Sequence, residues 1–90
     1  MKSSPKELEK ILKALGNRRR LMIVKYLQKT HGATVGSITD EIRASFKATS
    51  KHLAVLFAAD VVEREQMGLT VMYRLTEPIH AVVKTSLESM

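Results

Sequence analysis

Lys47 and Lys51 have the spacing in this sequence that most directly suggests a binding function. If residues 45–60 form a helix, the two lysines lie on one side of it with the small residues Ala54 and Ala58. The other side carries a core stripe and its flanks: Thr49, Leu53, Leu56, Phe46 and Phe57. A face of cations and small side chains can approach a polyanion closely, although an amphipathic helix with merely solvated lysines has the same pattern.

The distribution of charge supports a polyanionic partner. The chain has 90 residues and a formal net charge of +6, from 15 Lys and Arg side chains against 9 Asp and Glu. Residues 1–29 contain nine of the basic side chains and only Glu7 and Glu9 as acids, so the excess lies there. Nucleic acid is the favoured partner, and an anionic membrane is the second.

Composition excludes several classes of protein. Cysteine is absent, which excludes disulfides and thiolate metal sites. No apolar run approaches the roughly 20 residues of a membrane-spanning helix. Residues 1–5 lead directly into a charged amphipathic segment, so we expect no signal peptide, no membrane partner and a cytoplasmic location. The hydrophobic fraction of 44% indicates one globular domain over residues 1–90.

Capping signals predict where the first two helices begin. Ser4–Glu7 is a capping box with proline at the first helical position, so a helix should run over about 5–15. Gly16 ends it, and Asn17 should cap a second helix over about 18–29.

A helix-turn-helix is predicted in the middle of the chain. A short strand is expected near residues 34–35, after which Ser37 and Asp40 should cap a third helix. Ser45 should cap the fourth, over about 46–59. A short helix, a tight turn and a second helix with a basic outer face form this motif.

The pattern beyond residue 60 becomes strand-like. Residues 61–66 and 69–76 flank Gly68 and predict a β-hairpin, and residues 78–89 predict a last helix. The fold class is therefore mainly α with a β-hairpin wing (α+β), a winged helix-turn-helix in the order helix, helix, helix, helix, strand, strand, helix.

The terminal helices, at about 5–15 and 78–89, carry more apolar surface than so small a core should need. We therefore expect a homodimer with a two-fold axis. The predicted interface residues are Leu8, Ile11, Leu12, Ile79, Val82, Val83 and Leu87. Two such subunits could present their basic helices to successive turns of DNA, about 34–36 Å apart, and read an inverted repeat.

Three consecutive arginines, Arg18, Arg19 and Arg20, lie at the positive end of the second helix. They could be solvated or pair with Asp40 or Glu41. Alternatively, one or two of them could bind a phosphate together with free helix amides.

Three segments resemble the ArsR/SmtB family of winged-helix repressors. Residues 15–24 resemble the L-x-D-P-T-R-L-x-I-L opening of its second helix. Residues 45–62 resemble S-x-S-x-V-S-x-H-L-x-x-L-x-x-A-G-L-V, and residues 67–75 its G-x-x-V-x-Y-x-L wing. The resemblance spans about residues 8–76. It implies a dimeric transcriptional regulator in which Arg20 is structural, and in which Lys47 and Lys51, with Ser50, contact bases or phosphates.

The sensing part of that family's pattern is missing. Where metal-sensing members carry a C-x-C pair, this chain has Thr34 and Gly36, which cannot bind a soft metal. The last helix offers His80 with Lys84 and Glu88 at successive turns, a spacing that cannot form a metal site within one chain. We therefore expect no metal and no cofactor, and not a typical metal sensor. A site at His80 shared between subunits stays open.

Two further departures concern the DNA-binding surface. The wing tip, residues 66–69, lacks the arginines common in such wings. Phe46 stands where a polar residue is usual, and it could either pack beside Leu53 or touch a thymine methyl group.

The leading hypothesis is a dimeric repressor that reads an inverted-repeat operator in double-stranded DNA through the helix at about 46–59. The residues predicted to read bases are Lys47, Ser50, Lys51 and Phe46. Those predicted to contact phosphates are Arg18, Arg19, Arg64, Arg74 and Thr49.

The alternatives are a winged-helix module that binds protein and a nonspecific DNA-binding protein. Enzymatic activity is not expected, because no acid–base pair or phosphate loop is present. The effector, operator and target genes are not indicated.

Overall fold

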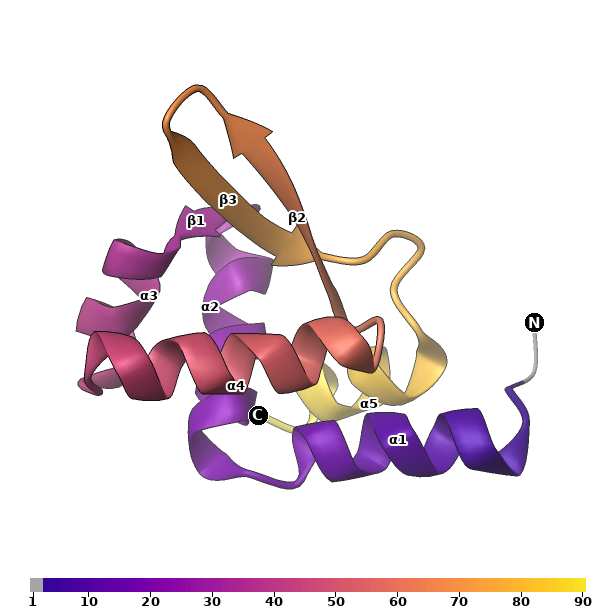
Figure 1. Ribbon diagram of the computed structural model, residues 1–90. Helices are drawn as coiled ribbons and strands as arrows, with labels where there is room; N and C mark the ends of the chain where they lie inside the picture. The colour runs from indigo at the N-terminus through magenta and orange to yellow at the C-terminus, as the bar shows by residue number, and fades with distance from the viewer. Residues whose placement is uncertain (1–2) are drawn as a thin grey trace.

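The computed structural model describes residues 3–90 and confirms the winged helix-turn-helix (Figure 1). Its elements in chain order are α1 (Pro5–Leu15), α2 (Arg18–Thr30), β1 (Ala33–Thr34), α3 (Val35–Ile42), α4 (Phe46–Ala58), β2 (Val62–Met67), β3 (Thr70–Leu75) and α5 (Ala81–Glu88). In Figure 1, α4 crosses the front of the domain above α1, and the hairpin of β2 and β3 rises from it.

Three helices begin at the predicted caps. Ser4 and Glu7 form the reciprocal capping box of α1, with each backbone amide donating to the other's side chain at 3.2 Å. Asn17 accepts from the Arg20 amide at the start of α2. Ser45 accepts from the Ala48 amide at 3.0 Å, which starts α4. These bonds satisfy amides that the first helical turn leaves without partners.

The predicted starts of α3 and α5 are wrong. The cap of α3 is Thr34, whose Oγ1 accepts from the Ser37 amide at 3.2 Å, so the helix begins before Ser37. The cap of α5 is His80, whose Nδ1 accepts from the Val82 amide at 3.1 Å. Residues 78–80 therefore precede the helix.

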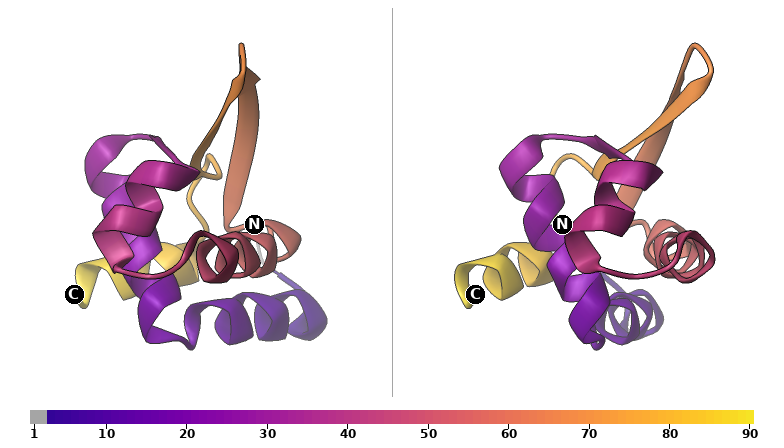
Figure 2. Two further views of the ribbon diagram at one scale, coloured as in Figure 1. Left: turned by 60° about the vertical axis from the view of Figure 1, so that its left-hand side comes forward. Right: turned by 90° about the vertical axis from the view of Figure 1, so that its left-hand side faces the viewer.

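The wing belongs to a three-stranded antiparallel sheet of order β1-β3-β2. β2 and β3 pair from Val62–Leu75 to Met67–Thr70, and Gly68, with φ of 65°, occupies the turn. The short β1 pairs with β3 through Ala33 and Thr34. Figure 2 shows that the far end of the hairpin projects away from the helices.

Part of the apolar stripe that was predicted to form the dimer interface lies in the core of the single chain. Ile11, Val83 and Leu87 are only 7%, 2% and 8% exposed and belong to the domain's own core. Little of their surface is left for a partner, because their side chains are already covered within one chain. Of the expected apolar stripe, Leu12 remains 51% exposed. Leu8, Ile79 and Val82 are half-buried.

Candidate nucleic-acid interface

The outer face of α4 is polar, and the opposite face of the helix is apolar and buried. Leu53 and Leu56 are 1% and 0% exposed and hold the helix against the core. The helix consequently directs Lys47, Ser50 and Lys51 to solvent. In the part of the chain that the structure describes, neither lysine has a carboxylate within ion-pair distance. Both ammonium groups are therefore free to meet a polyanion.

Thr49 was predicted to contact a phosphate, and the structure contradicts this. Its side chain is 0% exposed, and its hydroxyl donates to the Ser45 carbonyl at 2.9 Å. The same periodicity that places Leu53 in the core places Thr49 there. Its role is structural.

Phe46 lies in the first turn of α4 and is 64% exposed. The structure therefore does not show the first alternative, in which Phe46 packs beside Leu53 in the core. An aromatic ring this exposed next to Lys47 is available for an apolar contact, such as one with a thymine methyl group.

Arg20 connects three helices, which confirms its structural role. Its Nε donates to the carbonyl of Ala14 at 2.6 Å and a terminal nitrogen donates to that of Lys13 at 3.1 Å. These carbonyls belong to the last turn of α1, where backbone acceptors lack helical partners and cations are favoured. The other terminal nitrogen lies 3.4 Å from Nδ1 of His52 in α4.

The surroundings of His52 favour its neutral form. Burial, then the charges of Arg20 and Arg19, lower the pKa of His52 below its usual value. Because the guanidinium can only donate, Nδ1 accepts and Nε2 carries the proton. The contact between His52 and Arg20 was not foreseen, since 32 residues separate them.

Arg18 and Arg19 are exposed at the start of α2. The alternative that they pair with Asp40 or Glu41 is not observed, since no ion pair joins these groups among residues 3–90. The two guanidinium groups remain open to solvent beside the positive end of the helix.

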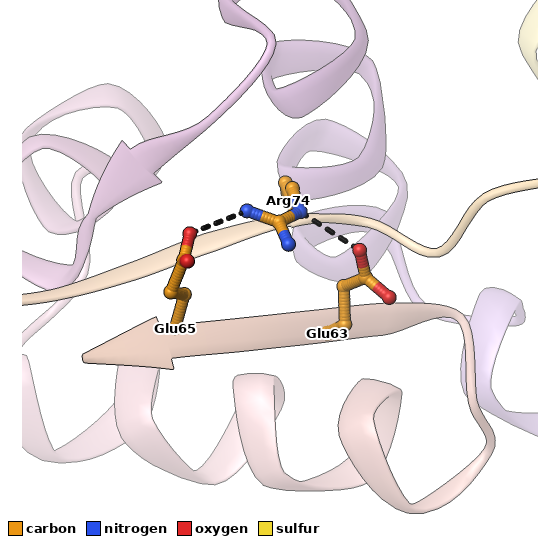
Figure 3. A network of polar contacts seen from close by, with 3 residues as sticks. All are labelled: Glu63, Glu65 and Arg74. Carbon is orange, nitrogen blue, oxygen red and sulfur yellow. Dashed lines mark hydrogen bonds and ion pairs between the residues drawn. The ribbon is translucent and has the colours of Figure 1, made fainter. Parts of the chain in front are cut away.

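Arg74, which was predicted to contact a phosphate, is ion-paired within the wing. Its Nε donates to Glu63 Oε1 at 2.7 Å, and a terminal nitrogen donates to Glu65 Oε1 at 2.8 Å (Figure 3). These carboxylates raise the pKa of Arg74 and outweigh its charge. The sequence contained a signal for this pair, because Glu63 lies directly opposite Arg74 in the hairpin register.

Arg64 remains available at the surface of the wing. Its guanidinium carbon lies 4.2 Å from the centre of the Phe57 ring on α4, a cation–π contact that couples the wing to this helix. At the wing tip, Leu69 is fully exposed and Met67 is 56% exposed. The wing tip therefore presents apolar side chains to solvent. It lacks arginines, as the sequence indicated.

No metal site is formed by the described residues. Residues 3–90 contain no group of three or more His, Asp or Glu side chains placed to hold a metal ion. His80 has both ring nitrogens engaged, since Nδ1 caps α5 and Nε2 lies 2.6 Å from the hydroxyl of Ser3. No helix in this range is long and apolar enough to cross a membrane.

The geometry defines the class of protein. A short helix α3, a turn at residues 43–45, a helix α4 with a free basic face and a β-hairpin beside it constitute a winged helix-turn-helix DNA-binding domain. The family model described as "Bacterial regulatory protein, arsR family" matches residues 17–64, which include α2, the helix-turn-helix and the start of the wing. The chain belongs to the ArsR family and is a DNA-binding transcriptional regulator.

Individual relatives agree with this assignment. The HTH-type transcriptional regulator YgaV of Escherichia coli (strain K12) is 26% identical over 86 residues, covering 94% of this chain and 87% of YgaV. HlyU from Vibrio cholerae N16961 has a TM-score of 0.81 at 30% identity, over 99% of this chain and 92% of HlyU. The transcriptional repressor BigR from Xylella fastidiosa has a TM-score of 0.79 at 27% identity, over 93% and 82% of the two chains.

Proposed function

We propose that the protein is a cytoplasmic, dimeric repressor that places α4 in the major groove of an inverted-repeat operator. The observation that carries this proposal is the free outer face of α4, where Lys47, Ser50 and Lys51 are exposed while Leu53 and Leu56 anchor the opposite side. It acts by occluding DNA and not by catalysis. Repression is supported by the relative BigR, which is itself described as a transcriptional repressor.

The contacts divide between bases and backbone. Lys47, Ser50 and Lys51 read base edges, and Phe46 contacts a thymine methyl group. Arg18, Arg19 and Arg64 bind phosphates, which position the protein and carry no sequence information directly.

Dimerisation is proposed to use the part of the apolar stripe that one chain leaves open. Leu12 is 51% exposed on α1, and Leu8 beside it is half-buried. Ile79 and Val82, before and within α5, are also half-buried and can add to this surface. A two-fold axis here would join two copies through the same patch on each.

Lys51→Ala should weaken binding to the operator by about 5- to 150-fold, the equivalent of one good base contact, and should affect a scrambled duplex much less. The measurement is fluorescence anisotropy with upstream DNA and a scrambled duplex at two salt concentrations. Lys25→Ala, which removes an exposed lysine of α2, is the control and should change neither affinity. Equal weak binding of both duplexes by the wild-type protein would reject operator reading in favour of nonspecific binding.

Leu69→Arg should strengthen binding to every duplex and steepen the dependence of log affinity on log salt by about 0.9, the value for one new phosphate contact. The reason is that Leu69 is fully exposed at the wing tip, and that the hairpin carboxylates Glu63 and Glu65 already pair with Arg74. Leu69→Gln is the neutral control. An unchanged salt slope would show that the wing tip stays away from the DNA backbone.

A further inference from the structure

The contact between Arg64 and Phe57 lies where the wing meets α4. Figure 1 shows β2 leaving the end of α4, and Arg64 belongs to β2 while Phe57 belongs to the last turn of α4. The guanidinium carbon of Arg64 lies 4.2 Å from the centre of the Phe57 ring. Because Phe57 is 39% exposed, its ring is not needed in full by the core and can support a side chain from the wing.

The hairpin register gives Arg64 no carboxylate partner. Successive side chains of a strand point to opposite faces, so Arg64 faces away from its neighbours Glu63 and Glu65. Figure 3 shows both glutamates turned towards Arg74, with which they pair. The residue directly opposite Arg64 in the hairpin is the uncharged Tyr73. Among residues 3–90, no carboxylate lies within ion-pair distance of Arg64.

An aromatic ring and a carboxylate hold a guanidinium group with different consequences. The glutamates that hold Arg74 use two of its N–H donors. The ring of Phe57 attracts the cation of Arg64 through its π electrons and takes up none of its donors as a hydrogen-bond acceptor. Arg64 is therefore held in place with its donors still free for a phosphate, which a guanidinium binds through two parallel hydrogen bonds.

The position of Phe57 along α4 is suited to a phosphate at the edge of the major groove. Phe57 follows Ser50 by two helical turns, on nearly the same line of the helix. With 13 residues, α4 is about 20 Å long, whereas the major groove is about 12 Å wide. If the first half of α4 lies in the groove, the end that carries Phe57 reaches the phosphates beside it.

We propose that Phe57 is a positioning residue for DNA binding, whose ring holds Arg64 ready for one phosphate at the border of the groove that α4 enters. This inference rests on the proposed function. Phe57 acts through Arg64 and does not itself touch DNA. Because the contact already orders Arg64 in the free protein, binding is spared the cost of ordering a long side chain, which is worth about two- to tenfold in affinity.

The first test measures the affinity of the full chain for upstream DNA by fluorescence anisotropy over a series of salt concentrations. Phe57→Leu should bind about two- to tenfold more weakly with an unchanged salt slope, since Arg64 is still present to meet the phosphate. Arg64→Met should weaken binding and also reduce the slope by about 0.9, the value for one phosphate contact. Phe57→Tyr keeps a ring and should bind like the wild type. Tighter binding by Phe57→Leu would show that the ring competes with the phosphate, and would overturn the proposal.

The second test separates positioning from a general structural role. In a protein that already carries Arg64→Met, adding Phe57→Leu should cause no further loss of affinity, because the side chain that the ring positions is gone. A ring that only shapes α4 would be missed equally in both backgrounds. An additive loss in the double variant would therefore contradict the proposal.

The third test needs no DNA. In the NMR spectrum of the isotope-labelled free protein, the Nε–H signal of Arg64 should move in Phe57→Leu, which removes the ring current, and should stay nearly unchanged in Phe57→Tyr. An Arg64 signal that Phe57→Leu leaves in place would show that the ring does not hold the guanidinium.

These measurements also separate two kinds of failure. If the wild-type protein binds no duplex, the proposed function is rejected, and the role of Phe57 on DNA is rejected with it. If the wild type binds upstream DNA but Phe57 and Arg64 act independently, only the role of Phe57 is rejected.

Discussion

Arg20→Met should lower the free energy of unfolding by about 2–4 kcal/mol, since hydrogen bonds to a charged group contribute about 1.5–3 kcal/mol each and are partly interdependent. The substitution removes the bonds from Arg20 to the carbonyls of Ala14 and Lys13. It also removes the contact with His52, so α1, α2 and α4 lose their common polar connection. Urea unfolding followed by circular dichroism measures this loss.

The control is Arg19→Met, which removes the neighbouring exposed arginine. We expect it to change stability by less than about 0.5 kcal/mol, as for most surface substitutions. Arg20→Lys should fall between the two, because an ammonium keeps the charge but cannot reproduce the planar fork. If Arg20→Met and Arg19→Met unfold at the same urea concentration, the bonds of Arg20 do not stabilise the fold.

Leu12→Glu should convert the proposed dimer to folded monomers and weaken operator binding by about 100-fold or more, since two linked half-sites gain roughly 10²–10⁴ in avidity. Leu12 is 51% exposed in the single chain, so a carboxylate there costs little in folding but would be buried at a dimer interface. Analytical ultracentrifugation gives the mass, and anisotropy gives the affinity.

Met22→Glu is the control for this experiment, because Met22 is 37% exposed on α2 and lies outside the proposed interface. It should remain dimeric. Val83→Glu is not a usable interface variant, since Val83 is 2% exposed in the core and the change should unfold the domain. A persistent dimer of Leu12→Glu would remove α1 from the interface.

The sequence by itself determined the order of the elements and the starts of α1, α2 and α4. Ser4, Asn17 and Ser45 each cap amides three positions away, so nothing outside the local segment is needed to predict them. Gly68 marked the hairpin turn for the same local reason.

The starts of α3 and α5 were not determined by local signals alone. Ser37 was the predicted cap of α3, but Thr34 is the observed one, and the pairing of Thr34 with Met72 in the sheet holds Thr34 in the extended conformation that a cap requires. At α5, Pro78 was a plausible first residue, but the helix instead begins after His80.

Only the tertiary structure decided which apolar side chains are buried, and which charged side chains form ion pairs, within one chain. Ile11 and Val83 were predicted to be interface residues, but they are buried in the core of the single chain. Periodicity shows that an apolar helix face will be buried, but it does not show whether the same chain or a partner buries it. Arg74 looked free for DNA until the folded wing placed Glu63 and Glu65 beside it. Caps and turns depend on atoms a few residues apart, whereas burial and ion pairing depend on distant segments meeting in space.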